Sequence, residues 1–292
     1  MKSKIFVSKI TGTDVNEAMA RLLEYLPFPI EARTIGIKIN LCDYRKPESG
    51  AVTDPIVLDP LLARVRQRYP DADIFVYEHD ATGTLASNLF GYVGVDRVAS
   101  RYGVRCVSLA NEKWVVKKIR GTHFSELEIP RILAECDLLI NHPKLKTHGQ
   151  VFMTCGLKNM YACHRLKRKV VYHRRLINEA IVDINMAIPS HLIVVDANLC
   201  VEGNRGPTQG LPKRVGLIIG GSDVVAVDAF GAKVMGFKPR KVRHIVLAAR
   251  MGLGSLNYQV IGDWDQQHAK FYKFKYSMFN YRLMQLARRL LK

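Results

Sequence analysis

A polar segment in the middle of the chain carries residue types that could bind an anion and move a proton. Lys144, Lys146 and His148 alternate in sequence, so an extended backbone points all three to one side. Lys158 follows the apolar residues 151–157, which indicates that it lies near the core. Ammonium groups bind carboxylates and phosphates, and histidine titrates near neutral pH. We expect this segment, interpreted as a loop that leads into a helix, to hold a small anionic metabolite for acid–base chemistry.

Short apolar stretches elsewhere in the chain also end in polar side chains. In an open α/β sheet, ligands bind outside the carboxyl ends of the strands, which predicts one shared cleft. The predicted catalytic residues are His148, Lys144, Asp196 and Glu202, where Asp196 or Glu202 fixes the tautomer of His148. The predicted substrate-binding residues are Lys38, Asn40, Thr53, Asp54, Glu78, Asn141, Lys146, Lys158, Asn159 and Gly206.

Strand-like and helix-like stretches alternate along the chain and must position these side chains. Short apolar or β-branched runs predict strands at residues 4–8, 34–40, 74–77, 105–109, 114–119, 137–140, 192–196 and 214–219. Apolar residues spaced by three and four predict helices at residues 14–25, 55–69, 95–102, 175–187, 224–235 and 240–249. The alternation predicts an α/β fold with a mostly parallel sheet and helices on both faces. We expect one domain over residues 1–263 and an appended tail over residues 264–292.

The composition is that of a globular protein. Of the 292 residues, 48% are hydrophobic and 24% are charged, which excludes a disordered chain, a collagen-like repeat and a small disulfide scaffold. The apolar runs are too short to span a membrane, and the first ten residues lack the apolar block of a signal peptide. Six scattered cysteines form no CxxC pair and predict free thiols. We therefore expect a cytoplasmic protein.

The net charge of +18 is concentrated in two segments. Residues 138–178 contain nine Lys or Arg and no acidic residue, and residues 266–292 contain seven and none. The rest of the chain is nearly neutral, which argues against nucleic-acid binding. In the tail, a helical stripe is formed by Tyr272, Tyr276, Phe279, Leu283, Leu286 and Leu290. This basic amphipathic helix is expected to dock on the domain or on a second copy of the chain, with contact to an anionic membrane as the alternative.

Two further patterns concern metals and a buried charge. His142, His148, Cys155, Cys163, His164 and His173 are close in sequence, but their spacing matches no standard zinc signature. We assign no metal ligand, and the residues identify no cofactor. Asp228 lies inside an apolar helical stretch, where a carboxylate is costly unless it is paired. We expect a Lys or Arg partner for it.

Several motifs in order resemble the family known as domain of unknown function 362, over residues 35–262. They are Lys38-Ile-Asn40, Thr53-Asp54-Pro55, the segment 141–148, Gly156-Leu-Lys-Asn159, Asp196 with Glu202-Gly and Gly206-Pro-Thr, and Asp223 with Ala226-Val-Asp228. Many members carry ferredoxin-type cysteine clusters, which this chain lacks. The Thr-Asp-Pro loop and the Pro-Lys/His segment are also similar in pattern to nickel-pincer lactate racemases. That likeness implies a small hydroxy acid or similar anion as substrate, with movement of a proton or hydride.

Three hypotheses follow. The first is an isomerase, lyase or oxidoreductase that acts on a small anionic metabolite. The second, which the family resemblance implies, is an iron–sulfur or other metal-dependent redox protein that would use Cys155, Cys163 and nearby histidines. The third is a non-enzymatic binder of RNA or anionic membrane, with binding that weakens as salt rises.

Overall fold

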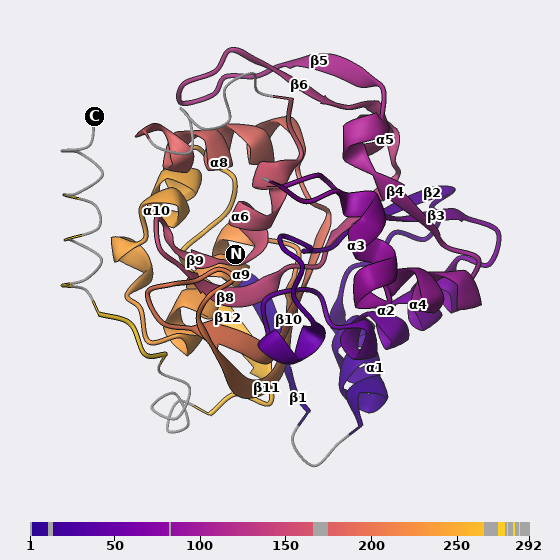
Figure 1. Ribbon diagram of the computed structural model, residues 1–292, viewed down its shortest axis with the longest axis horizontal. Helices are drawn as coiled ribbons and strands as arrows, with labels where there is room; N and C mark the ends of the chain where they lie inside the picture. The colour runs from indigo at the N-terminus through magenta and orange to yellow at the C-terminus, as the bar shows by residue number, and fades with distance from the viewer. Residues whose placement is uncertain are drawn as a thin grey trace.

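The computed structural model describes residues 2–10, 14–81, 83–165, 175–265, 274–277, 279, 283 and 286. Its elements follow one another along the chain as shown in Figure 1. They are β1 (Ser3–Lys9), α1 (Val15–Tyr25), β2 (Thr34–Lys38), α2 (Pro55–Arg68), β3 (Asp73–Glu78), α3 (Ala86–Val93), α4 (Val95–Arg101), β4 (Arg105–Ser108), β5 (Trp114–Lys118), β6 (Glu126–Pro130), α5 (Arg131–Glu135), β7 (Leu138–Asn141), β8 (Lys144–His148), β9 (Phe152–Thr154), α6 (Gly156–Asn159), α8 (Ile177–Ala187), β10 (Leu192–Glu202), β11 (Leu211–Gly221), α9 (Val224–Val234), α10 (Arg243–Arg250) and β12 (Tyr258–Gly262).

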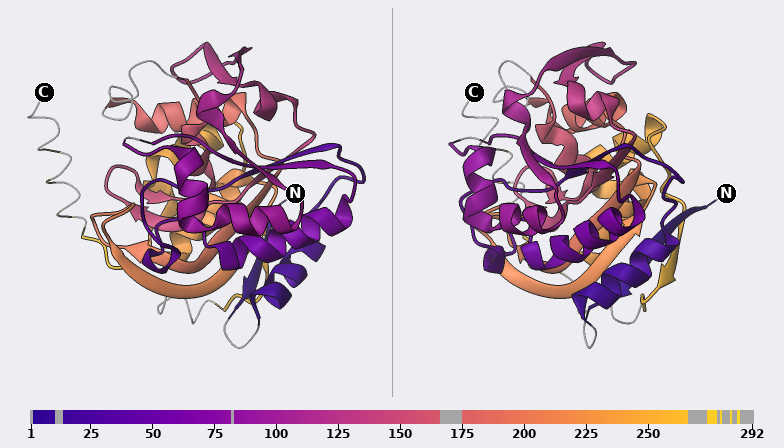
Figure 2. Two further views of the ribbon diagram at one scale, coloured as in Figure 1. Left: turned by 45° about the vertical axis from the view of Figure 1, so that its right-hand side comes forward. Right: turned by 90° about the vertical axis from the view of Figure 1, so that its right-hand side faces the viewer.

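One large sheet organises the molecule. Its strand order is β12-β1-β11-β10-β7-β2-β3-β4, and β8 joins it by pairing with β10 and β9. Along the main path only β11 runs against its neighbours, β1 and β10. Figure 2 shows β10 and β11 as a long curved ribbon. The predicted α/β fold with a mostly parallel sheet is confirmed.

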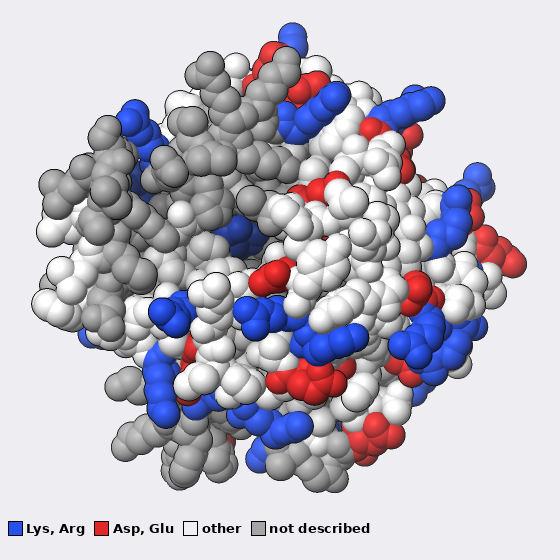
Figure 3. All heavy atoms as spheres, viewed as in Figure 1, with Lys and Arg blue, Asp and Glu red and all other residues white. Residues whose placement is uncertain are grey.

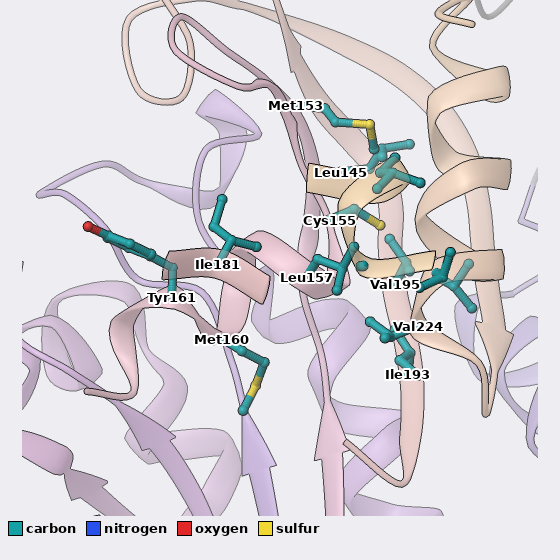
Figure 4. Packing of buried hydrophobic residues seen from close by; sticks show 14 of the residues in the cluster. Leu145, Met153, Cys155, Leu157, Met160, Tyr161, Ile181, Ile193, Val195 and Val224 are labelled. Carbon is teal, nitrogen blue, oxygen red and sulfur yellow. The ribbon is translucent and has the colours of Figure 1, made fainter. Parts of the chain in front are cut away.

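Apolar side chains cover both faces of this sheet. One buried cluster joins Leu22 of α1 and Leu61 of α2 to Ile37 of β2. The other joins Ile181 of α8 and Phe230 of α9 to strands that include β10. Figure 4 shows part of this second cluster, with Leu157 of α6 beside Val195. Burial of apolar surface on both faces holds the strand ends in a fixed arrangement.

Local signals at the helix starts agree with this architecture. The Asp14 side chain accepts a hydrogen bond from Asn16 N and caps α1, and Asp54 caps α2 in the same way through Ile56 N. Pro55 follows at the first position of α2, where its missing N–H costs nothing. Asp223 caps α9. These caps fix where each helix leaves the sheet.

Some predicted elements differ from the structure. The segment 144–148, predicted as a loop, is strand β8, because it pairs with β10 and with β9. The predicted strand 114–119 pairs with β6 in a separate two-stranded sheet rather than joining the large one. Helix α3 was not predicted at all.

The tail and the domain boundary stay predictions. β12 pairs with β1 and ends at Gly262, so the last strand of the sheet ends next to the predicted boundary at residue 263. Most of the predicted amphipathic helix of residues 264–292 lies outside the described residues. Within the described ranges, no helix is long and apolar enough to cross a membrane.

Candidate functional site

The carboxyl ends of β2, β3 and β7, together with β8 and the middle of β10, bring most of the predicted site residues together. They form two polar clusters. We call the first the carboxylate cluster; it comprises Asp54, His142, Lys144 and Asp196. We call the second the amide ladder; it comprises Asn40, Asn141, Lys146 and Asn159. All of these side chains are buried.

The carboxylate cluster contains a buried ion pair. Lys144 Nζ lies 2.8 Å from Asp196 Oδ2. The second Asp196 oxygen accepts a hydrogen bond from Asn198 N at 3.1 Å, and Asp54 N approaches Oδ2 at 3.4 Å. Burial, and then the negative charge of Asp196, raise the pKa of Asp54. The one ammonium of this cluster is therefore already matched by carboxylate charge.

His142 completes the carboxylate cluster. Its Nδ1 lies 2.6 Å from Val194 O. A carbonyl can only accept, so Nδ1 carries the proton and Nε2 keeps a lone pair. Among the described residues Nε2 has no hydrogen-bond partner. Burial lowers the pKa of His142, which favours the neutral ring. His142 follows a predicted strand and was weighed as a metal ligand, but it was not among the predicted site residues.

The amide ladder is a directional chain of hydrogen bonds. Lys146 Nζ donates to Asn40 Oδ1 at 2.7 Å, and Asn40 Nδ2 donates to Asn159 Oδ1 at 2.8 Å. Asn159 Nδ2 then donates to Asn141 Oδ1 at 2.8 Å, and Asn141 Nδ2 donates to Gly156 O at 2.9 Å. Each amide both donates and accepts, so no side chain in the ladder can turn without breaking a buried bond.

Neighbouring groups hold the ladder in place. Thr53 Oγ1 accepts a hydrogen bond from Asn40 N at 2.8 Å. Beside it, Lys38 Nζ lies 2.6 Å from Glu78 Oε1 in a second buried ion pair. Thr53, Lys38 and Glu78 were predicted to bind substrate, and the structure uses their polar atoms to support the backbone and the ladder.

Two ammonium groups at the ladder have no carboxylate within ion-pair distance among the described residues. Lys146 is buried and donates to Asn40, to Ala51 O and to Cys42 Sγ, none of which is a carboxylate. Lys158 is half-buried, and its Nζ lies 4.3 Å from the centre of the Tyr161 ring. Burial, and then the charge of Lys146, lower the pKa of Lys158 to about 8. Figure 3 shows a hollow in this face over α6, with Lys or Arg atoms at its floor.

His148 lies away from the carboxylates predicted to orient it. Its Nδ1 accepts a hydrogen bond from Gln150 N at 3.1 Å. Asp196 is occupied by Lys144, and Glu202 accepts from Lys275 N at 2.9 Å and lies 3.5 Å from Lys213. Among the described residues, His148 is bonded to neither carboxylate. Glu202 instead holds the backbone of Lys275, within the predicted tail.

Gly206, predicted to bind substrate, packs against the backbone of β8. Gly206 O accepts a hydrogen bond from Gly149 N at 3.1 Å. A Cβ at position 206 would lie 2.1 Å from Thr147 O, so only glycine fits against this strand.

The buried carboxyl of Asp228 corrects another expectation. No Lys or Arg pairs with it among the described residues; it accepts instead from Leu157 N, at 3.3 Å to Oδ1 and 3.2 Å to Oδ2. Burial raises its pKa to about 7, which the Cys155 thiol and the backbone N–H groups of Leu157 and Gly156 partly oppose. Asp228 thus supports α6, the helix that carries Lys158 and Asn159.

The described part of the chain offers no set of side chains for the metal site of the second hypothesis. Within it, no group of three or more His, Cys, Asp or Glu side chains is arranged to hold a metal ion. Cys155 and Cys163 are both buried, and His173 lies outside the described residues.

Comparisons with known proteins give one family and several more distant likenesses. The family model described as "Domain of unknown function (DUF362)" matches residues 35–233. The thylakoid-associated protein sll1697 of Synechocystis sp. is 32% identical over 136 residues, which is 44% of this chain and 42% of that protein. The chain therefore spans less than half of that relative.

Two solved structures show a more distant similarity. The lactate racemase apoprotein from Thermoanaerobacterium thermosaccharolyticum is 16% identical with a TM-score of 0.46, over 80% of this chain and 57% of that one. A Thermotoga maritima protein is 12% identical with a TM-score of 0.41, over 81% of this chain and 58% of that one.

Proposed function

The chain belongs to the DUF362 family, and on that premise we propose that it is an enzyme that binds a small carboxylate or phosphate at Lys158, in the positive field of Lys146. The match over residues 35–233 confirms the family resemblance seen in the motifs. The observation that carries the proposal is the pair of ammonium groups at the amide ladder that have no carboxylate partner among the described residues.

The electrostatics of the ladder favour an anion. A buried cation is costly unless an opposite charge compensates it. Among the described residues, Lys38 and Lys144 each pair with a carboxylate, whereas Lys146 and Lys158 have none within ion-pair distance. The three hydrogens of the Lys146 ammonium face Asn40, Ala51 and Cys42, so this residue contributes its charge. The Lys158 ammonium faces only an aromatic ring among the described groups, so it can donate hydrogen bonds to a ligand.

Lys158 also supports acid–base chemistry on the bound anion. A lysine with a pKa of about 8 exchanges its proton readily near neutral pH, as a general acid or base must. Lys158 therefore takes the role predicted for His148, whose expected carboxylate partners are engaged elsewhere. The reaction class, whether isomerase, lyase or oxidoreductase, and the cytoplasmic location stay predictions from the sequence.

A ligand screen tests this proposal. Wild-type protein is titrated by calorimetry with inorganic phosphate, sulfate and a panel of small mono- and dicarboxylates. Binding is expected for wild type and is expected to weaken at least about tenfold in Lys158→Met and Lys146→Met, since each removes one positive charge from the site. Lys117→Met on exposed β5 is the matched control and should bind as wild type. Equal binding by all four proteins would overturn the proposal.

A second measurement addresses catalysis. Each carboxylate that binds is incubated with the protein in D2O and followed by proton NMR. Loss of the C–H signal beside the carboxylate, in wild type but not in Lys158→Met, would support proton transfer. Binding without exchange of any such proton, and without another chemical change of the ligand, would reduce the protein to a binder.

The tail supports a second candidate function, association with an anionic membrane surface. Phe279, Leu283 and Leu286 are 70%, 48% and 52% exposed, at sequence spacings of four and three. Residues 266–292 supply seven basic and no acidic side chains, which complements anionic lipid. A relative with 32% identity is named a thylakoid-associated protein.

Vesicle co-sedimentation tests the tail. Binding to phosphatidylglycerol vesicles is expected, with little binding to phosphatidylcholine vesicles. Substitution of Phe279, Leu283 and Leu286 by Ser should abolish it. Vesicle binding that survives this triple change would contradict the membrane role. A wild-type dimer that the triple variant converts to a monomer, without vesicle binding, would assign the stripe to a second copy of the chain.

A further inference from the structure

A thiol lies at the edge of the amide ladder, in contact with its buried ammonium. Cys42 follows β2 in the chain, and its Sγ lies 3.1 Å from Lys146 Nζ. The second polar neighbour of the thiol is Ala51 O, at 3.7 Å. Cys42 is half-buried, so a small reagent can reach it. An ammonium group thus donates directly to the sulfur of Cys42.

The other cysteines provide an internal comparison. Cys106 and Cys136 are half-buried like Cys42, and burial raises their pKa to about 12 and about 11. Cys155 and Cys200 are fully buried, and burial raises the pKa of each thiol as well. Two thiols of similar exposure thus lie in surroundings that disfavour the anion, whereas Cys42 receives a hydrogen bond from an ammonium.

Lys158 links the thiol to the proposed anion site. Lys146 Nζ donates to both Cys42 Sγ and Asn40 Oδ1, and Asn40 Nδ2 donates to Asn159, which directly follows Lys158 in α6. An anion bound at Lys158 would therefore lie near a nucleophilic sulfur. These two cations have no carboxylate partner in the described part of the chain, and a thiol contacts one of them. Such a group can bind and attack the same small molecule.

We propose that Cys42 is the nucleophile of this site and attacks the carbonyl carbon of a small carboxylate or phosphate that carries an aldehyde or ketone. This inference rests on the proposed function. The sulfur anion forms the S–C bond, the electron pair of the C=O π bond moves to oxygen, and the oxygen takes a proton from the Lys158 ammonium. The products are a hemithioacetal (or hemithioketal) and a neutral amine, and no further reactant is consumed.

Two alkylating reagents test the inference without knowledge of the substrate. Iodoacetate is a small carboxylate and iodoacetamide is its neutral counterpart. With either, the sulfur forms an S–C bond and iodide leaves with the C–I electron pair. An ordinary thiolate reacts more slowly with iodoacetate, because like charges repel. At Cys42 we expect the opposite order, with iodoacetate at least about tenfold faster than iodoacetamide, saturation at high iodoacetate and inhibition by inorganic phosphate.

Peptide mass spectrometry assigns the rates to individual cysteines in one sample. Cys106 and Cys136 serve as matched controls and should react slowly, with iodoacetamide the faster reagent. Cys42→Ser confirms the labelled peptide. Lys158→Met should abolish the preference for iodoacetate, and Lys146→Met should also slow the reaction of Cys42 with iodoacetamide.

The outcomes separate this inference from the proposed function. If phosphate binds and Lys158→Met weakens it, but Cys42 reacts no faster than Cys136 with either reagent, the nucleophile is overturned and the anion site stands. If Cys42 reacts rapidly with iodoacetamide but shows no preference for iodoacetate, the thiol is reactive outside an anion site and the inference fails. If phosphate does not bind and no preference appears, both fail together.

Discussion

Two lysines on one strand, two residues apart, have opposite surroundings. Lys144 and Lys146 both belong to β8 and both are buried. Lys144 faces the Asp196 carboxylate at 2.8 Å, whereas Lys146 faces the oxygens of Asn40 and Ala51 and the sulfur of Cys42. The charge of Lys144 is neutralised by a carboxylate, and no carboxylate of the described residues neutralises that of Lys146. The available positive charge of the proposed site therefore lies on the amide-ladder side of β8.

The largest effect is expected in the carboxylate cluster. Lys144→Met leaves Asp196 as a buried carboxylate without its cation, which should cost about 3–5 kcal/mol in the free energy of unfolding. Urea denaturation measures this cost. The double variant Lys144→Met/Asp196→Asn removes both charges and should recover part of the loss. If Lys144→Met were as stable as wild type, the buried ion pair between Lys144 and Asp196 would be contradicted.

The same change at Lys146, in the amide ladder, should cost less stability than Lys144→Met but should weaken anion binding. Lys146→Met leaves two buried acceptors, Asn40 Oδ1 and Ala51 O, without this donor but leaves no carboxylate unpaired. We expect a loss of about 1–3 kcal/mol in unfolding free energy, smaller than for Lys144→Met. Sulfate affinity should nevertheless fall at least about tenfold, by calorimetry. Retained affinity in a folded Lys146→Met protein would erase the difference between the two lysines.

The pH dependence of anion binding should identify Lys158. Because the pKa of Lys158 is lowered to about 8, its ammonium is present below that pH and is lost above it. Sulfate, whose own charge is constant in this range, should bind well at pH 6–7 and progressively less through pH 8–9. Lys158→Arg keeps a positive charge at every such pH and should bind sulfate at pH 9. Binding by wild type that is unchanged from pH 6 to 9 would contradict this role.

The smallest expected effect is a change in the pH dependence of stability, and it comes from Asp54, the second carboxyl group of the carboxylate cluster. The pKa of Asp54 is raised in the folded protein, so its contribution to stability is present at low pH and is lost as the pH rises through that value. Asp54→Asn keeps the helix cap but cannot ionise, so its stability relative to wild type should improve by a few tenths of a kcal/mol between pH 4 and 7. Thermal unfolding of both proteins at pH 4 and pH 7 measures the change. If Asp54→Asn lost stability relative to wild type between pH 4 and pH 7, the prediction would be contradicted.

Much of the fold could be predicted from the pattern of residues, because strand and helix periodicities and cap residues are local. The helix at Asp54-Pro55 and the buried strands that end at Lys38 and Glu78 are examples. Strand β8 could not be recognised in this way, since its buried face carries lysines rather than the apolar residues typical of a strand. Its pairing with β10 depends on tertiary register.

The sequence predicted which polar residues belong to the candidate site, but it did not predict their hydrogen-bond and ion-pair partners. The rule that ligands bind at strand ends grouped Asn40 with Asn141, and the structure joins both to Asn159 by hydrogen bonds. The partners of each lysine depend on contacts between residues 52 and 106 positions apart, as for Lys144 with Asp196 and Lys146 with Asn40. Local sequence patterns cannot predict partners that are so far apart in the chain. Cys42 was treated as an ordinary free thiol for the same reason, since its ammonium neighbour lies 104 positions away.

The position of a bound anion is the most direct test of the account. Crystals of wild type and of Lys146→Met would be soaked in sodium bromide and measured at the bromine absorption edge. We expect an anomalous peak within hydrogen-bond distance of Lys158 Nζ on the ladder side of β8, and a weaker or absent peak there in Lys146→Met. Bromide beside Lys144 with nothing at Lys158, or equal peaks at Lys158 in both proteins, would contradict it.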